Sequence, residues 1–330
     1  MSPPPLEQPP PPDTRHVACA ACGADRPQPT YTVYDLIWDD PTPWQFVRCG
    51  DCGHGYLDPQ PTPAALSALY EGLYTPDKLD VMVKIGEGRF DRRLQQDRAK
   101  AIAAVAEQPV GRILDVGCGV GFSLQVLARA LPEAEAVGVE MAGPAADKAD
   151  ELSEITVIKQ PFMTLKMAAS SVDVLCMNHL LEHLSDPHPQ LSRAAELVRP
   201  GGLIEIEVPQ LEGWARTTFG RWFWCHLPPQ HLQLFHLAGL TRLLAESGFS
   251  EIVTVQRTGY PINLTVTMSL FIKHTVGSAS RFARNWLIRG PILLAGILAM
   301  PFTLLFDATA GVLLNRTQGD ILRVIARRDC

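Results

Sequence analysis

A carboxylate followed by three alternating glycines is the part of this sequence with the clearest chemistry. An apolar run over 112–116 leads into the motif Asp115-Val-Gly-Cys-Gly-Val-Gly121. Gly117, Gly119 and Gly121 would let the backbone turn sharply and approach a ligand where a Cβ atom would collide. A carboxylate just before them suits a cationic amino-acid group and would repel a pyrophosphate. The alternative is a tight strand-to-helix turn without a ligand.

The spacing of these glycines disfavours a dinucleotide site. A G-x-G-x-x-G fingerprint would need glycine or alanine at Phe122 or Leu124, which makes a nicotinamide enzyme a weak alternative. A second apolar run, 136–140, ends in Glu140, where a carboxylate can accept hydrogen bonds from both hydroxyls of a ribose. Glu140 alone could equally be a solvated acid. Together with Asp115 and the glycines, it favours a ligand site.

Four of the eight cysteines are paired at the spacing of a metal site. They lie in two C-x₂-C-G turns, 19–23 and 49–53. Four thiolates in two such turns make a closed tetrahedral zinc site, which indicates a structural rather than a catalytic metal. Disulfides, four incidental buried thiols, or His54 as a substitute ligand are the alternatives. The predicted ligands are Cys19, Cys22, Cys49 and Cys52.

Composition limits the class of protein. The 330 residues are 46% hydrophobic and 19% charged, with a formal net charge of −6, so the chain can bury a large core. The acidic balance disfavours a nucleic-acid partner, since phosphate binding normally needs a basic surface. The start of the chain lacks the pattern of a secretory signal, and the remaining cysteines are scattered. Both observations favour the cytoplasm.

Short apolar runs alternate with amphipathic stretches from about residue 110 onward. This pattern predicts an α/β fold with a doubly wound, mostly parallel seven-stranded sheet. The expected strands are 112–116, 136–140, 155–159, 172–177, 203–208, 251–256 and 321–326.

We expect four stretches along the chain. Proline-rich residues 1–15 form a disordered tail, 16–60 the zinc ribbon, and 61–107 connecting helices. Residues 108–330 form the main domain, with an apolar helical insertion at 286–315.

The motif from Asp115 to Gly121 resembles the first motif of the class I S-adenosylmethionine (AdoMet)-dependent methyltransferases. The resemblance continues through 172–187, 197–202 and 227–235. It implies that Asp115 and the glycine loop hold the methionine end of AdoMet, and that Glu140 holds the ribose. Many members carry an acid near the adenine after the third strand, where this chain has Lys159-Gln-Pro-Phe162. We assign Gln160 and Phe162 to the adenine, and Asn178, after the fourth strand, also to the cofactor.

A zinc ribbon before such a domain resembles the subgroup that includes sugar C-methyltransferases, down to Tyr56-Leu-Asp-Pro-Gln-Pro61. The extra C-terminal domain of those enzymes has no counterpart here, so their sugar substrate is not carried over.

Methyl transfer needs alignment and a dry site, and it needs a base only where the acceptor loses a proton. His231, in an aromatic loop, and His179, after the fourth strand, are the candidate bases; structural histidines are the alternative. Asn178 is followed by His179 and Leu180, which differs from the pattern of nucleobase N-methyltransferases. We therefore expect an oxygen or carbon acceptor on a small molecule, which could be lipid- or glycan-linked. An RNA methyltransferase and a non-catalytic AdoMet-binding adaptor are the alternatives.

Residues 291–306 carry no charge, and four basic residues precede them without acidic neighbours: Lys273, Arg281, Arg284 and Arg289. Proline at 301 and glycines at 296 and 311 favour a hairpin or an in-plane insertion over a full span. We expect monotopic attachment at the inner face of a membrane, with a helical hairpin that covers the sheet or forms a dimer as the alternative. The oligomeric state has no signature in the sequence.

Overall fold

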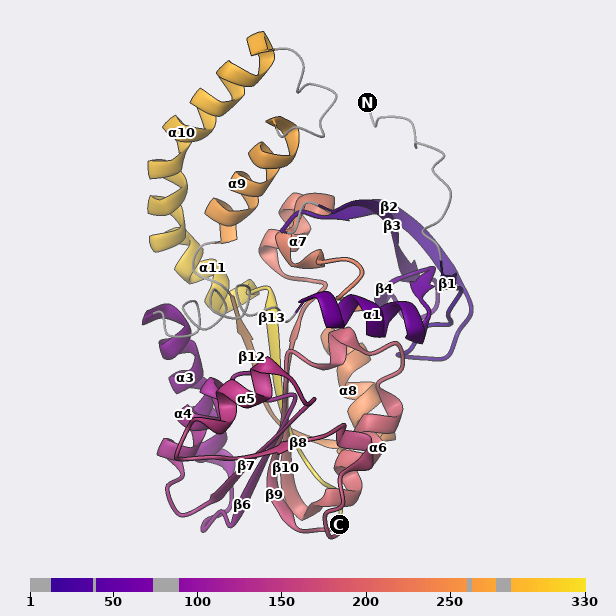
Figure 1. The fold of residues 1–330 in the computed structure, drawn as a ribbon, viewed down its shortest axis with the longest axis vertical. Coiled ribbons are helices and arrows are strands. Elements are labelled where there is room, and N and C mark those ends of the chain that lie inside the picture. Colours follow the sequence, from indigo (N-terminus) through magenta and orange to yellow (C-terminus); the bar gives the residue numbers. More distant parts are fainter. Residues whose placement is uncertain (1–12, 38–39, 74–88, 260–262, 277–285) are drawn as a thin grey trace. The chain divides into compact units, whose positions relative to one another are not determined.

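The computed structural model describes residues 13–37, 40–73, 89–259, 263–276 and 286–330. The chain forms two compact units (Figure 1). Unit 1 comprises Met1–Leu66, Leu211–Leu234 and Thr258–Asp320, and unit 2 comprises Ser67–Gln210, Phe235–Arg257 and Ile321–Cys330. Each unit therefore draws on segments that are far apart in the sequence.

Unit 2 contains a seven-stranded sheet in the order β12-β13-β10-β9-β6-β7-β8. Strands β10, β9, β6, β7 and β8 pair in parallel, and β13 pairs with β10 antiparallel. All seven expected runs are strands, so the predicted fold class is confirmed. Their bounds are β6 Arg112–Val116, β7 Glu135–Glu140, β8 Thr156–Lys159, β9 Val172–Asn178, β10 Val198–Pro209, β12 Glu251–Thr258 and β13 Ile321–Arg327.

Amphipathic helices cover this sheet. Ile102 of α3 and Leu124 and Leu127 of α4 lie in one buried cluster with Ile113 of β6 and Val174 of β9. These strands read as apolar runs because both faces of a parallel sheet are covered. The helices of unit 2 are α3 Arg89–Val105, α4 Phe122–Ala130, α5 Pro144–Asp150, α6 His188–Leu197 and α8 Leu237–Glu246, with 3-10 turns η1 Phe162–Thr164 and η2 Leu181–His183.

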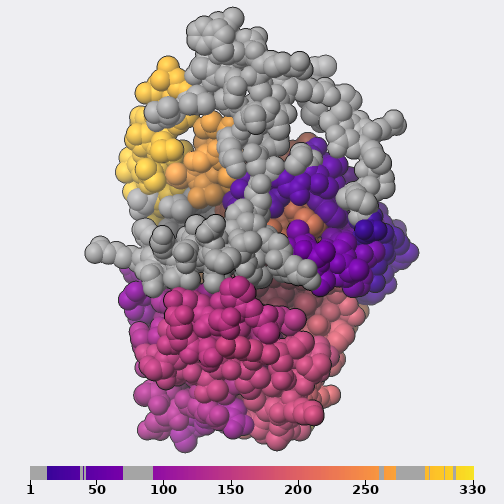
Figure 2. Space-filling view, in the orientation of Figure 1, coloured from indigo at the N-terminus to yellow at the C-terminus, as the bar shows by residue number. Residues whose placement is uncertain are grey.

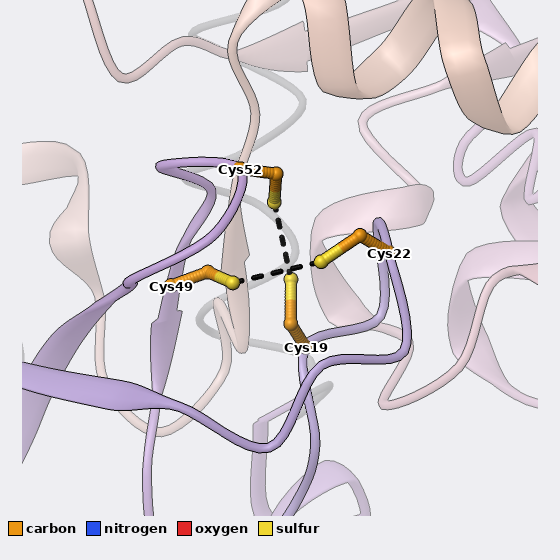
Figure 3. A group of neighbouring side chains, drawn as sticks. All are labelled: Cys19, Cys22, Cys49 and Cys52. Atoms are coloured by element: carbon orange, nitrogen blue, oxygen red, sulfur yellow. Dashed lines mark hydrogen bonds between the residues drawn. The ribbon is translucent and has the colours of Figure 1, made fainter.

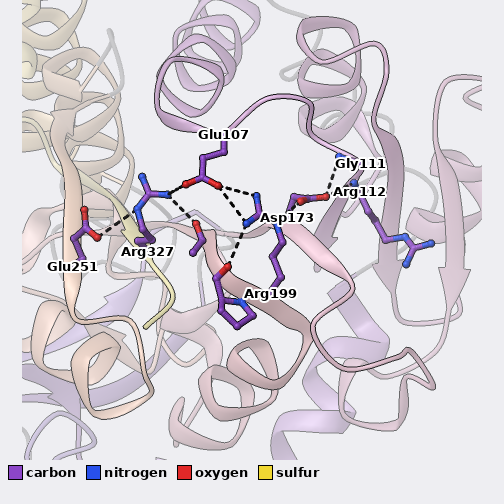
Figure 4. Close-up of polar contacts among 9 residues, drawn as sticks. Glu107, Gly111, Arg112, Asp173, Arg199, Glu251 and Arg327 are labelled. Atoms are coloured by element: carbon purple, nitrogen blue, oxygen red, sulfur yellow. Dashed lines mark hydrogen bonds and ion pairs between the residues drawn. The ribbon is translucent and has the colours of Figure 1, made fainter. Parts of the chain in front are cut away.

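An ion network ties the amino ends of the parallel strands together (Figure 4). Asp173, at the start of β9, accepts hydrogen bonds from the backbone N–H groups of Gly111 (2.9 Å) and Arg112 (2.8 Å). It also pairs with Arg199 at 2.6 Å. Burial tends to raise the pKa of Asp173, but these donors outweigh it and hold the pKa below its ordinary value. The network stabilises the sheet at the amino ends of its parallel strands, opposite the glycine loop at their carboxyl ends.

Unit 1 contains a four-stranded antiparallel sheet in the order β11-β4-β3-β2. Val33, Phe46 and Leu57 of this sheet pack with Leu211 and Leu232. The strands are β2 Pro27–Asp35, β3 Asp40–Cys49, β4 Gly55–Leu57 and β11 Gln233–Leu234, and β1 Thr14–Arg15 pairs with β5 Gln60–Pro61. Helix α1 Pro63–Leu73 begins in unit 1 and continues into unit 2. The other helices of unit 1 are α7 Trp214–Phe219, α9 Asn263–Val276, α10 Trp286–Ala308 and α11 Ala310–Gln318, with 3-10 turns η3 Gly220–Trp222 and η4 Trp224–His226.

The ends of the expected tail and of the apolar insertion differ from the prediction. Residues 1–12 lie outside the described residues, but Thr14 and Arg15 form a strand instead of extending the tail. Helix α10 runs through Pro301, because a proline removes only one hydrogen bond from a long helix. The break instead falls at Thr309, between α10 and α11.

Within the part of the chain that the structure describes, no helix combines the length and apolar character needed to cross a membrane.

Candidate functional site

The glycine loop joins β6 to α4 at the carboxyl end of the sheet. Its first turn is fixed by hydrogen bonds from the N–H groups of Gly117 (2.8 Å) and Cys118 (3.2 Å) to the carbonyl of Val139. A Cβ atom at Gly121 would lie 2.7 Å from the side chain of Ile155, so this position requires glycine. A Cβ atom at Gly119 would meet no atom within 4 Å, so the tip of the loop has open space beside it.

Asp115 is a buried carboxylate with unused hydrogen-bonding capacity. Its side chain is 1% exposed, and its Oδ1 atom has no hydrogen-bond partner among the described residues. Burial raises the pKa of Asp115 to about 7, with Arg98 opposing this shift and Glu205 and Glu140 adding to it. A buried carboxylate oxygen without a donor is costly. An ammonium group from a ligand would satisfy it, so Asp115 fits the amino-acid end of AdoMet.

Glu140 lies against the glycine loop. Its carboxylate accepts hydrogen bonds from the N–H of Gly119 (2.7 Å) and the N–H of Met141 (2.8 Å). A carboxylate has about four acceptor positions, so capacity remains for the hydroxyls of a ribose. Asn178, at the end of β9, donates to Ser123 Oγ at 3.2 Å, and its buried Oδ1 has no partner among the described residues. All three acceptors stand at carboxyl ends of neighbouring parallel strands.

The residues assigned to the adenine follow β8, which neighbours β7. Gln160 donates its backbone N–H to Ile158. Phe162 begins η1 and is 8% exposed. Beside Glu140, the side chain of Met141 is 60% exposed, which offers an apolar surface that the sequence analysis did not single out. The only sequence signal for Met141 is its position directly after Glu140.

His179 is held between two carboxylates. Its Nδ1 lies 3.0 Å from Glu182 and its Nε2 3.5 Å from Glu207. Burial tends to lower the pKa of His179, but these two carboxylates outweigh it and raise the pKa to about 10. The imidazole therefore keeps both protons at neutral pH. A base needs a lone pair, so this geometry argues against His179 as the general base and for a charged, structural role.

Behind His179 lies a chain of buried charges that the sequence analysis missed. Arg98 of α3 forms a bidentate pair with Glu205 at 2.8 and 3.1 Å. Arg323 of β13 pairs with Glu207, at 2.6 Å from its Nε, and with Glu205 at 3.5 Å. Two acids at i and i+2 in the apolar run 203–208 were the available signal, because they point to one buried face. Their partners are more than 100 positions away, so the pairing itself could not be predicted.

His231 lies in unit 1, on the segment before β11. Its Nδ1 donates to the carbonyl of Cys225 at 2.8 Å, and its backbone N–H donates to Leu227. A proton on Nδ1 places the lone pair on Nε2, which is the tautomer that a general base needs. The side chain is 8% exposed. The roles of His231 and His179 as bases stay predictions.

The four predicted metal ligands converge in unit 1 (Figure 3). Their sulfur atoms all lie within 4.8 Å of one another, with Cys19 and Cys52 3.6 Å apart and Cys22 and Cys49 3.5 Å apart. A tetrahedral zinc with Zn–S bonds of about 2.3 Å places sulfurs about 3.8 Å apart, so the donor set fits zinc.

The surroundings of Cys49 suit a bound metal, whereas burial raises the pKa of Cys19 and Cys52. Burial raises the pKa of Cys49, but the backbone N–H groups of Cys52 and Asp51 outweigh it and hold the pKa at about 7. This favours the thiolate form that zinc binds. His54 lies outside the cluster, and its Nε2 is 2.8 Å from Gln233 Oε1. The predicted alternative ligand therefore has a different, structural partner.

A family model described as a methyltransferase domain matches residues 89–255, just over half of the chain. The chain belongs to this methyltransferase family. In chain order, the match spans the sheet from β6 into β12 and includes the glycine loop. It confirms the resemblance drawn from Asp115 to Gly121. The zinc ribbon lies outside the matched residues.

Individual relatives agree with this assignment. A trans-aconitate 2-methyltransferase from Deinococcus radiodurans is 31% identical over 108 residues, which cover 32% of this chain and 41% of that enzyme. A ubiquinone biosynthesis O-methyltransferase from Ruegeria pomeroyi is 32% identical over 136 residues, covering 40% and 51%. The chain thus spans about half the length of these curated relatives or less.

A solved structure supports the fold. The phosphoethanolamine N-methyltransferase 2 of Haemonchus contortus superposes with a TM-score of 0.51 at 13% identity, covering 84% of this chain and 63% of that protein. At this identity, the likeness concerns the fold alone.

Proposed function

We propose that this methyltransferase-family chain transfers the methyl group of AdoMet to an oxygen or carbon atom of a small-molecule acceptor. The observation that carries the proposal is the buried Asp115 carboxylate, with its unpartnered Oδ1, at the head of the glycine loop. A cationic amino-acid group is the ligand that this oxygen requires, and Glu140 on the neighbouring strand suits the ribose of the same molecule.

The residues divide the work as follows. Bound AdoMet would supply a methyl group that is already activated on a positively charged sulfur. Asp115 and the glycine loop hold the amino-acid end, Glu140 orients the ribose, and Gln160 and Phe162 contact the adenine. These contacts fix the direction of the methyl group, which is the main requirement of an in-line transfer. Asn178 adds a further acceptor at the same edge of the sheet.

Where the acceptor is a hydroxyl, His231 is our candidate for the group that removes its proton. The Nδ1–H donated to Cys225 leaves Nε2 as the accepting atom. A carbon acceptor that is already nucleophilic needs no such base. We assign His179, which lies between Glu182 and Glu207, to a structural role and keep its role as a base as the alternative.

The zinc proposed at the four cysteines has a structural role. All four ligand positions are filled by thiolates, which leaves no open position for a substrate. Zinc would instead join the two turns that begin and end the β2–β3 hairpin.

A small-molecule acceptor is supported by the two enzymes named above, a trans-aconitate methyltransferase and a ubiquinone biosynthesis O-methyltransferase. The net charge of −6 disfavours the RNA methyltransferase alternative. The scattered cysteines continue to favour action in the cytoplasm. A lipid- or glycan-linked acceptor remains within the proposal.

The test is transfer of a labelled methyl group. The protein is incubated with isotopically labelled AdoMet and metabolite or lipid extracts, and the products are identified by mass spectrometry. We expect a labelled small molecule with wild type and at least about a tenfold lower yield with Asp115→Asn, from the loss of a charge-assisted contact. Labelled RNA instead would favour the RNA alternative. Cofactor binding without any labelled product would favour the adaptor alternative.

A further inference from the structure

Helix α10 carries an exposed apolar stripe. Leu294, Leu298, Phe302 and Leu305 follow one another at intervals of four, four and three residues, which places them on one face of the helix. Their side chains are 58%, 63%, 75% and 63% exposed. Leu313 of α11 is 65% exposed as well. We call these five residues the apolar stripe.

Polar groups lie between α9 and α10, away from the apolar stripe. Asp307 of α10 is 2% exposed and accepts hydrogen bonds from the backbone N–H groups of Leu264 (3.1 Å) and Thr265 (2.9 Å) at the start of α9. The hydroxyl of Thr265 donates to Asp307 at 2.7 Å and lies 3.1 Å from the hydroxyl of Thr303, which is 8% exposed. Buried polar groups therefore join the two helices near the start of α9, while the apolar stripe of α10 is exposed.

A helix pair that folds in water normally covers its most apolar face, whereas α10 leaves the apolar stripe exposed. An exposed apolar stripe together with polar groups satisfied between the helices is the expected arrangement beside hydrocarbon. Close contact through a small residue also fits. A Cβ atom at Gly296 of α10 would collide with the side chain of Ile272 of α9, so the two helices approach closely.

The hairpin is also fixed within unit 1. The ring of Phe306 lies 5.8 Å from that of Trp214, and the ring of Phe271 lies 5.1 Å from that of Trp222. Figures 1 and 2 both show α9 (orange) and α10 (yellow) side by side. Because α9 and the two tryptophans pack on the inner side of the hairpin, the apolar stripe lies on its outer side.

The charge of the sequence segment that contains the hairpin indicates which kind of partner would cover the apolar stripe. Between Glu251 and Asp307 the sequence contains five basic residues and no acidic residue, in a chain whose net charge is −6. A second copy of the chain would add another segment of the same positive net charge, which disfavours a contact between copies. A surface of anionic lipid headgroups would attract a segment of this charge.

We propose that the α9–α10 hairpin and α11 lie on the surface of an anionic lipid bilayer, with the apolar stripe at the boundary between headgroups and hydrocarbon. The hairpin lies in the plane of the interface. This proposal does not depend on methyl transfer, since the stripe belongs to unit 1 and the glycine loop to unit 2.

The test is co-flotation of the full-length protein with vesicles of phosphatidylcholine alone and of phosphatidylcholine with phosphatidylglycerol. We expect the protein to float with the anionic vesicles at low salt, and less so as salt rises. Leu298→Ser with Phe302→Ser should weaken binding by at least about tenfold, given the apolar surface removed.

The matched control replaces two other exposed apolar side chains, Met163→Ser with Val255→Ser, which are 46% and 38% exposed in the wild type. This control should float like wild type, and both variants should keep the thermal stability of wild type. Wild type that stays in the soluble fraction with both kinds of vesicle would overturn the proposal. A wild-type dimer in light scattering that becomes monomeric in the stripe variant would also overturn it, and would assign the stripe to a second copy.

Discussion

At the scale of single residues, the sequence was informative where chemistry and spacing coincide. Asp115 and the glycines were predictable because a strand-to-helix turn that holds a ligand needs those residue types in a short segment. The role of His179 was not predictable, since it depends on Glu207, which arrives from another strand. The sequence shows that a histidine follows a strand, but the two carboxylates that fix its charge are visible only in the fold.

The buried pair of Arg98 and Glu205 gives a stability prediction at this scale. Arg98→Met should lower the free energy of unfolding by about 3 kcal/mol, because the buried Glu205 loses its bidentate partner and keeps only Arg323 at 3.5 Å. Urea denaturation measures the change. Arg93→Met is the control, since it removes an exposed arginine from the same helix. Equal losses in the two variants would mean that the buried pair is not important for stability.

His231 gives a prediction for the reaction. With a hydroxyl acceptor, His231→Gln should lower kcat by about 100-fold or more through loss of the base. The affinity for AdoMet should stay unchanged, because His231 is not among the residues assigned to the cofactor. Steady-state kinetics with the acceptor identified by mass spectrometry, together with a cofactor titration, separates the two effects. An unchanged kcat would refute the role of His231 as a base.

At the scale of elements, the seven strands of unit 2 were predictable because each one is a distinct apolar run. The assembly of unit 1 was not. Strand β11 contains only Gln233 and Leu234, too short for any periodic pattern, yet it completes the sheet that contains β3 and β4. Helix α10 was predictable as apolar, but not its partner α9, because the contact depends on Asp307 and Thr265.

The metal prediction belongs to the two cysteine turns. Cys19→Ser with Cys49→Ser should lose one zinc per chain, as measured by elemental analysis, because two of four ligands are removed. Cys330→Ser removes an exposed cysteine and should keep the zinc. We expect AdoMet binding to survive in the double variant, since the glycine loop belongs to unit 2. A double variant that still holds zinc would refute the assignment.

At the scale of the whole molecule, charge is unevenly distributed along the sequence. An acidic chain contains one long segment without any acid, between Glu251 and Asp307, and most of it lies in unit 1. The order of charged residues in the sequence shows this asymmetry. The sequence could not show that the apolar residues of α10 face outward, because helical periodicity identifies a face and not what covers it.

The raised pKa of Asp115 contributes to the pH dependence of stability and of cofactor binding. Burial raises this pKa to about 7, so the folded chain binds a proton that the unfolded chain releases near its ordinary value of about 4. The resulting stabilisation is fully present below about pH 4 and is lost as pH rises through 7. The pH dependence of AdoMet affinity has the opposite sign. Affinity rises with pH, because the ammonium group of AdoMet needs the ionised carboxylate. The affinity for AdoMet should therefore fall about tenfold between pH 8 and pH 6.

Calorimetric titration of AdoMet into wild type and Asp115→Asn at pH 8 and pH 6 tests the cofactor site most directly, with Glu133→Gln, an exposed acid, as control. We predict binding by wild type and control that weakens about tenfold at the lower pH. Asp115→Asn should bind at least about tenfold more weakly than wild type at pH 8 and show little dependence on pH. Binding by Asp115→Asn as tight as that of wild type at pH 8 would contradict the assignment of the glycine loop as the AdoMet site.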